Sequence, residues 1–209
     1  DRAAERSGKA VHLKDIHLER GMQCVDCHFK QDNHGDGKLY SEPRVAIEIT
    51  CADCHGTSSR RAFGNDPLPA NWTLRTTGPA APEGGGTDLL SLNTPSGARR
   101  FAADQRTRRL VQRSMTNQDL SWLVPQVMDS ITPGTPLFNE KARLAKTMQR
   151  DGRTWGDGSS PNLAHADERM SCTTCHSSWV TSCFGCHLSQ SANQRRDELH
   201  NGMKTTRNW

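Results

Sequence analysis

Eight cysteines and four histidines of this chain recur in one short pattern, C-x-x-C-H, which occurs four times. The pattern accounts for every cysteine: Cys24, Cys27, Cys51, Cys54, Cys172, Cys175, Cys183 and Cys186. Each second cysteine is followed directly by a histidine: His28, His55, His176 and His187. This is the attachment pattern of c-type haem, in which two thiols add to the vinyl groups and the histidine binds the iron. The sequence therefore predicts four covalently bound c-type haems.

Zinc binding and disulfide formation are the alternative uses of paired cysteines. Two C-x-x-C pairs can form a zinc ribbon, and the pairs that begin at Cys24 and Cys51 have a tolerable spacing for one. Four cysteines would complete such a site, however, and would leave the histidine after each pair without a role. Disulfides would not require those histidines either, so the pattern favours haem.

The composition agrees with a protein whose interior is built partly from cofactors. Of the 209 residues, only 33% are hydrophobic and 5% are aromatic, which is too little for a large side-chain core. A porphyrin is a large apolar surface, so four of them can replace much of that core, and folding should depend on them. We therefore expect a mostly irregular, haem-cored fold with a few α-helices, long loops and little or no β structure.

The formal net charge of +4 does not describe the haem-loaded chain. Each haem adds about −2 from its propionates and about +1 from a ferric porphyrin, so four haems bring the charge close to zero. The basic residues thus give no argument for a nucleic-acid partner, and none is expected. No apolar run is long enough for a transmembrane segment.

The haem motifs lie toward the two ends of the chain, which predicts two haem pairs joined by a long insertion. The first pair occupies residues 1–60 and the second pair residues 161–209. Residues 61–160 contain neither cysteine nor histidine and form a haem-free insertion.

Within the insertion, residues 64–98 are rich in proline and glycine and should form an irregular connection. Two helices are predicted after it, one over residues 101–115, which carry four arginines, and one over residues 137–150. Pro125, Pro133 and Pro136 interrupt the stretch between them.

An internal repeat relates the two haem-bearing ends. His17 and His165 each lie seven residues before the first cysteine of a pair, and a methionine lies two residues before that cysteine. Each copy is followed by a second motif. In the later pair only six residues separate His176 from Cys183, so the two macrocycles must lie nearly in contact.

Five histidines outside the motifs are candidates for the second axial ligand of the irons: His12, His17, His34, His165 and His200. Four irons need four such ligands, so we predict bis-His ligation throughout. His17 and His165 are the first choices because they occupy equivalent repeat positions. His34 and His200 complete the set, with His12 as a surplus residue or an alternative to His17. Methionine is the rival ligand, but those nearest the motifs are too close to reach the far face of their own haem.

These features resemble the bis-His multihaem cytochromes of anaerobic and metal-respiring microbes. The units H-x4-M-x-C-x-x-C-H that begin at His17 and His165 carry the resemblance. Residues 28–37 and 171–187 are also similar to segments of larger multihaem cytochromes, whereas the resemblance is weak across residues 60–150. It implies a continuous row of haems along which electrons hop, a periplasmic, cell-surface or extracellular location, and a role in anaerobic respiration.

Electron transfer, without catalysis, is the function that four fully ligated irons favour. The main alternative is a multihaem oxidoreductase acting on nitrite, hydroxylamine or a sulfur compound, which needs an iron with an open position. Such enzymes often mark that iron by a lysine in place of the motif histidine or by an extra cysteine ligand, and this chain has neither. A third reading is the tetrahaem subunit of photosynthetic reaction centres, whose methionine ligands on helices before each motif are missing here.

The surplus of distal histidines favours work inside a larger haem array. Five candidates exceed the need of four irons, and the chain starts in a charged segment and stops in a polar tail at Trp209. We expect redox protein partners or neighbouring haem-bearing chains, or a longer protein that contains this segment. In such an array His12 or His200 would ligate a haem across a boundary, or haem edges would face the next unit.

Overall fold

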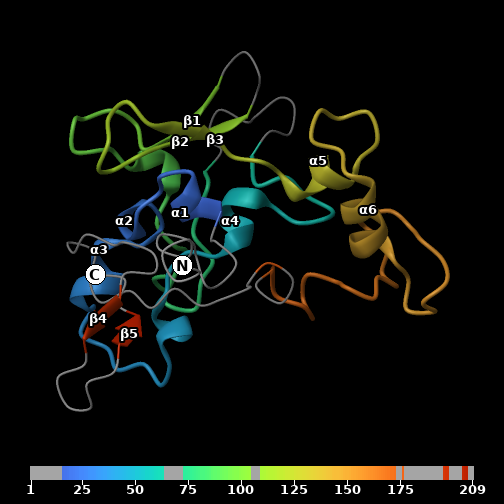
Figure 1. Ribbon diagram of the computed structural model, residues 1–209, viewed down its shortest axis with the longest axis horizontal. Coiled ribbons are helices and arrows are strands. Elements are labelled where there is room, and N and C mark those ends of the chain that lie inside the picture. The colour runs from blue at the N-terminus through green and yellow to red at the C-terminus, as the bar shows by residue number, and fades with distance from the viewer. Residues whose placement is uncertain are drawn as a thin grey trace, which may run out of the picture.

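The computed structural model describes residues 16–63, 73–104, 109–172 and 176, and the backbone of residues 195–197 and 204–206 (Figure 1). Its helices are α1 (Ile16–Glu19), α2 (Cys24–Cys27), α3 (Lys30–His34), α4 (Cys51–His55), α5 (Val127–Ile131) and α6 (Glu140–Thr147), with 3-10 turns η1 (Pro43–Ala46) and η2 (Leu89–Ser91). Its strands are β1 (Phe101–Ala103), β2 (Leu110–Arg113), β3 (Ser121–Leu123), β4 (Arg195–Asp197) and β5 (Lys204–Thr206). None of the helices in these ranges is long and apolar enough to cross a membrane.

A small antiparallel sheet replaces one of the predicted helices. The strands lie in the order β1-β2-β3, with Phe101 opposite Gln112 and Gln112 opposite Trp122. The helix predicted over residues 101–115 is therefore wrong. Arginine is a good helix former, which favours that prediction locally. In β2, however, buried Leu110 and Gln112 alternate with half-exposed residues, and this burial on one face overrides the local preference.

The helix predicted over residues 137–150 is confirmed with tighter bounds, as α6. It begins after Asn139, whose side-chain oxygen accepts a hydrogen bond from the Ala142 amide at 3.1 Å and caps the first turn. The short α5 precedes it and packs against it. The proline- and glycine-rich stretch is irregular across residues 73–98 except for η2 and isolated bridges.

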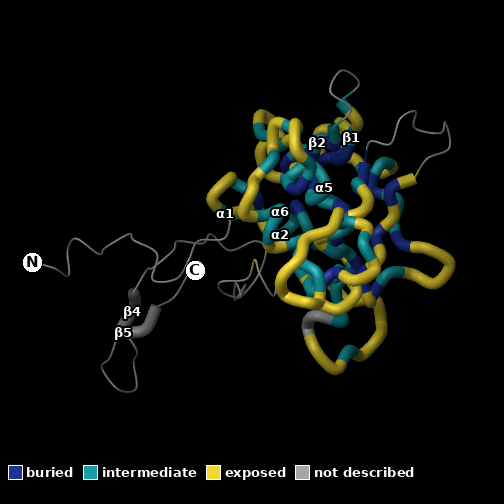
Figure 2. Tube along the Cα trace, turned by 90° about the vertical axis from the view of Figure 1, so that its right-hand side faces the viewer, coloured by how far each residue is buried: buried dark blue, intermediate teal, exposed yellow. Residues whose placement is uncertain are grey.

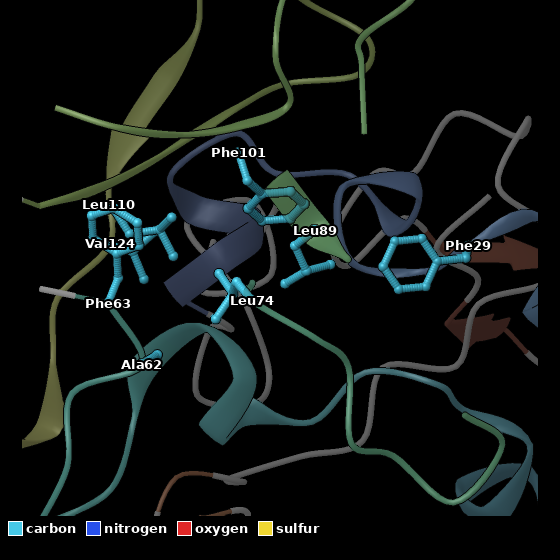
Figure 3. Packing of buried hydrophobic residues seen from close by; sticks show 8 residues of the cluster. All are labelled: Phe29, Ala62, Phe63, Leu74, Leu89, Phe101, Leu110 and Val124. Atoms are coloured by element: carbon cyan, nitrogen blue, oxygen red, sulfur yellow. The ribbon is translucent and has the colours of Figure 1, made fainter. Parts of the chain in front are cut away.

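A compact group of apolar side chains forms the core of the described part, and most of it comes from the insertion. Its buried members are Phe29, Ala62, Phe63, Leu74, Leu89, Phe101, Leu110 and Val124. Figure 3 shows Phe101, Leu89 and Leu74 between Phe29 on one side and the group of Leu110, Val124 and Phe63 on the other. Cys54 of the second haem motif packs against this cluster. The core therefore lies directly beside a predicted haem attachment site.

The described part is mostly irregular, with few helices and a small sheet, and exposed loops surround its buried segments (Figure 2). The haem-cored architecture with two haem pairs stays a prediction, as does the division at residues 60 and 160. Contacts cross both boundaries. The core joins Phe29 to Phe101, and the Ser58 amide donates to Asp167 Oδ2 at 3.1 Å.

Two leucines give a matched test of this core. Leu89 is fully buried and Leu39 is fully exposed, at 0% and 103% relative accessibility. Leu89→Ala should lower the free energy of unfolding by about 2–5 kcal/mol, since it removes buried methyl groups and leaves a cavity. Leu39→Ala should change it by less than about 0.5 kcal/mol. Thermal unfolding of the haem-loaded variants checks this, and equal melting temperatures for the two variants would contradict the assigned core.

Candidate haem-binding site

Each of the first two haem motifs winds a single helical turn. Residues at i, i+3 and i+4 lie on one face of a helix, so α4 directs Cys51, Cys54 and His55 to the same side. In the first motif α2 does this for Cys24 and Cys27 and ends before His28. This is the arrangement that one macrocycle requires. The turns are capped by the residue between the cysteines. Asp26 Oδ2 accepts from the Gln23 amide and Asp53 Oδ2 from the Thr50 amide, both at 2.8 Å.

The same two aspartates bind the insertion to the motifs. Asp26 Oδ1 accepts a hydrogen bond from the Met115 amide at 2.6 Å. Asp53 accepts two from Thr77, through the amide at 2.9 Å and the hydroxyl at 2.6 Å. Both carboxylates are buried, at 0% and 5% accessibility. These two aspartates were not among the predicted site residues. Their signal in the sequence is that the first two motifs read C-x-D-C-H, whereas the others carry Thr174 and Gly185 at that position.

The side chains of His17 and His55 lie close together. Their ring centres lie 6.0 Å apart, with 49° between the ring planes. A metal bound to two imidazole nitrogens at about 2 Å each holds the ring centres about 6 Å apart. The preferred distal candidate, on α1, therefore lies beside the histidine of the second motif, at the end of α4.

Backbone carbonyls fix the orientation of two candidate ligands. His55 Nδ1 donates to the Pro125 carbonyl at 2.7 Å, and His165 Nδ1 donates to the Ala145 carbonyl at 2.5 Å. A carbonyl accepts only, so Nδ1 carries the proton and Nε2 keeps its lone pair for a metal. The insertion provides both carbonyls, which explains how a segment without haem ligands contributes to the site.

In the first motif a carboxylate, and not a backbone carbonyl, orients the histidine. His28 Nδ1 lies 3.3 Å from Asp32 Oδ2, which also accepts from the Phe29 amide at 3.1 Å. The other oxygen of Asp32 is buried without a hydrogen-bond partner in the described part of the chain. A carboxylate behind an imidazole orients the ring and makes it a more basic ligand.

The electrostatics of His55 favour its neutral form, which is the form that binds a metal. Burial lowers the pKa of His55, and the hydrogen bond to Pro125 partly opposes that effect. The nearby rings of His17 and His176 lower the pKa of His55 further. The histidine of the third motif is thus close enough to act on that of the second.

The cysteines show that consecutive motifs adjoin. Burial raises the pKa of the Cys54 thiol, and the neighbouring Cys27 thiol of the first motif raises it further. The pKa of the Cys51 thiol is also raised, first by burial and then by the neighbouring Cys172 thiol of the third motif. The first motif therefore lies beside the second, and the second beside the third.

The remaining predicted site residues are placed only in part. His34 is exposed at the end of α3, and His176 is exposed as well. The others lie outside the described residues: His12, Cys175, Cys183, Cys186, His187 and His200. Among the residues that are described, no group of three or more His, Cys, Asp or Glu side chains is arranged to hold a metal ion.

The chain shows short likenesses to known cytochromes. No protein-family profile matches it, and no solved structure matches it. Proteins named cytochrome c-552 from two strains of Haemophilus influenzae are 35% identical over 51 residues, and one from Haemophilus ducreyi is 31% identical over 55 residues. These matches cover 22–24% of this chain, which spans only about a tenth of the length of these relatives, 10–11%. The likeness supports a c-type cytochrome with covalently bound haem.

Removal of one imidazole tests the pairing of His17 with His55. His17→Ala should open one iron per chain, which becomes high-spin and binds carbon monoxide when reduced. Electron paramagnetic resonance and carbon monoxide difference spectra report this. In a background that carries Cys51→Ser and Cys54→Ser, the second haem is absent, so His17→Ala should open no further iron. A new high-spin iron in that background would assign His17 to another haem.

Proposed function

We propose that this chain is a tetrahaem cytochrome c that transfers electrons through a row of bis-His haems and catalyses no reaction of its own. The observation that carries the proposal is the proximity of the imidazole rings of His17 and His55, whose centres are 6.0 Å apart. Two imidazoles on one iron leave no open position for a substrate. The four complete motifs support the number of haems, and the likeness to proteins named cytochrome c-552 supports a c-type cytochrome.

The internal repeat extends the ligand assignment to the second pair. His17 lies near the histidine of the second motif of its own end, with 6.0 Å between the ring centres. By the repeat, His165 serves the haem of the fourth motif, and its Nδ1 is already held by the Ala145 carbonyl, which leaves Nε2 for iron. His34, His200 and His12 then supply the irons of the first and third motifs, within this chain or across a boundary to a neighbouring one.

The protein fixes positions, while the bound haems supply iron centres that take up and release single electrons. Asp26 and Asp53 hold the attachment turns, and the carbonyl of Pro125 holds His55. Rigid ligands change little between the oxidised and the reduced state, which favours fast electron transfer. The adjoining motifs support a path in the order first, second and third, since the Cys27–Cys54 and Cys51–Cys172 neighbours bring their attachment sites together.

The location and partners that we propose rest on the resemblance of the haem motifs to those of multihaem cytochromes. We place the protein in the periplasm or at the cell surface, in anaerobic respiration. Its partners would be redox proteins or neighbouring haem-bearing chains of a larger array.

Protein-film voltammetry separates an electron conduit from an enzyme. The haem-loaded chain, with four haem additions by intact mass, should give signals that integrate to four electrons per chain. Nitrite, hydroxylamine or tetrathionate should leave these signals unchanged, because no iron has a free position. The His17→Ala variant provides the control, since its opened iron should respond to added ligand. A catalytic current from the unmodified protein with any of these substrates would favour the oxidoreductase alternative.

A further inference from the structure

A cavity of about 70 Å³ lies at α3 and the loop that follows it, next to the first haem motif. This volume is large enough for a cation that keeps part of its water shell. Ala46 of η1 and Ala80 of the insertion form part of the wall. The other lining residues come from α3 and its loop: Gln31, Asp32, Gly35, Asp36, Lys38 and Tyr40.

One carboxylate oxygen in this wall is buried and has no partner. The side chain of Asp32 is only 3% accessible. Its Oδ2 accepts from the Phe29 amide at 3.1 Å and lies 3.3 Å from His28 Nδ1. Its Oδ1 is buried without a hydrogen-bond partner in the described part of the chain. A buried charged oxygen that gains nothing in place of water is costly, so the geometry indicates a ligand that Asp32 binds from the cavity.

A second carboxylate lines the same cavity. Asp36 is exposed, and its position is fixed by the Lys38 amide, which donates to Oδ1 at 3.0 Å, and by the Tyr40 hydroxyl, which donates to Oδ2 at 2.6 Å. Each carboxylate oxygen has two lone pairs, so Asp36 can still bind a cation. None of the ion pairs in the described ranges joins the Lys38 ammonium to Asp32 or Asp36, so no direct contact neutralises the two carboxylates.

The chemistry of the lining selects the class of cation. Gln31 and Tyr40 add neutral oxygen atoms to the two carboxylates, and none of the lining residues is a cysteine or a histidine. Calcium and magnesium prefer such oxygen ligands, whereas zinc and copper favour nitrogen and sulfur. Magnesium demands a near-ideal octahedron, while calcium accepts an irregular set of protein oxygens and water. A mixed set of oxygens on a helix end and an irregular loop therefore suits calcium.

We propose that Asp32 and Asp36 bind one calcium ion in this cavity, with neutral oxygens and water in the remaining positions. Asp32 then serves two groups, because Oδ1 binds the ion and Oδ2 orients His28. The ion fixes the loop after α3 against the first motif. With only two carboxylates the site belongs to the weak class of calcium sites, with a dissociation constant on the order of 0.1–1 mM.

A calcium titration of the haem-loaded chain, after dialysis against a chelator, tests this proposal. Equilibrium dialysis should find one calcium ion per chain at saturation. Calcium should also raise the midpoint of thermal unfolding, because the ion binds the folded chain, and magnesium at the same concentration should raise it less. Asp36→Asn keeps the shape of the side chain and removes its charge. It should weaken calcium binding at least about tenfold, the loss that is typical even for groups that only support a metal ligand.

Asp157→Asn is the matched control. Asp157 is also exposed and accepts from an amide two residues further on, that of Ser159 at 2.8 Å, and from a hydroxyl at 2.6 Å, but it does not line the cavity. This variant should bind calcium as the unmodified chain does. Ala46→Leu keeps both carboxylates and fills the cavity, so it should also weaken binding, and it decides the matter if Asp36→Asn does not fold.

Three results would overturn the calcium site. They are the absence of saturable calcium binding by the unmodified chain, an equal response to magnesium, and unchanged calcium binding by Asp36→Asn or Ala46→Leu. Haem content and spin state are measured on the same samples. Four low-spin haems in a chain that binds no calcium would leave the electron-transfer proposal standing, so the two proposals fail separately.

Discussion

The described structure depends on buried carboxylates that bind the backbone of loops. Asp26 and Asp53 each accept hydrogen bonds from the start of their own helical turn and from the insertion. Glu48, which is fully buried, does the same for two further loop segments through Thr76 Oγ1 at 2.7 Å and the Thr87 amide at 2.9 Å. Hydrogen bonds to charged groups are stronger than neutral ones, and a buried acceptor that loses its donors is costly. The loops are therefore held firmly although few apolar residues are available.

This constraint explains how the haem-free insertion serves the haem motifs. The motif turns are too short to be stable helices by themselves. The insertion supplies donors to their aspartates, carbonyls to His55 and His165, and most of the apolar core next to Cys54. The backbone of the insertion approaches the first haem-bearing segment closely at Gly78, whose amide donates to the Glu48 carbonyl at 2.7 Å. A side chain at Gly78 would collide with that carbonyl. The insertion therefore stabilises the first two attachment sites through hydrogen bonds and packing.

The sequence predicts the chemistry of this protein better than its architecture. Haem attachment and the importance of His17 follow from local spacing, and α6 follows from helical periodicity. The strand at Leu110 could not be found this way, because its local preference is helical and only burial and pairing reverse it. The position of His17 beside His55 depends on the tertiary fold, which the spacing of residues along the chain does not contain. Asp53 was visible within its motif, but its importance lies in its contact with Thr77, 24 residues away.

We propose that His17 of α1 and His55 of α4 are the two axial ligands of one iron on the second motif. The most direct measurement is a diffraction experiment on the haem-loaded protein at the iron absorption edge, in which anomalous peaks locate every iron without reference to the chain. The account predicts one iron between Nε2 of His17 and Nε2 of His55, about 2 Å from each. An iron bound to His55 whose opposite face is open, or is occupied by a ligand other than His17, would contradict it.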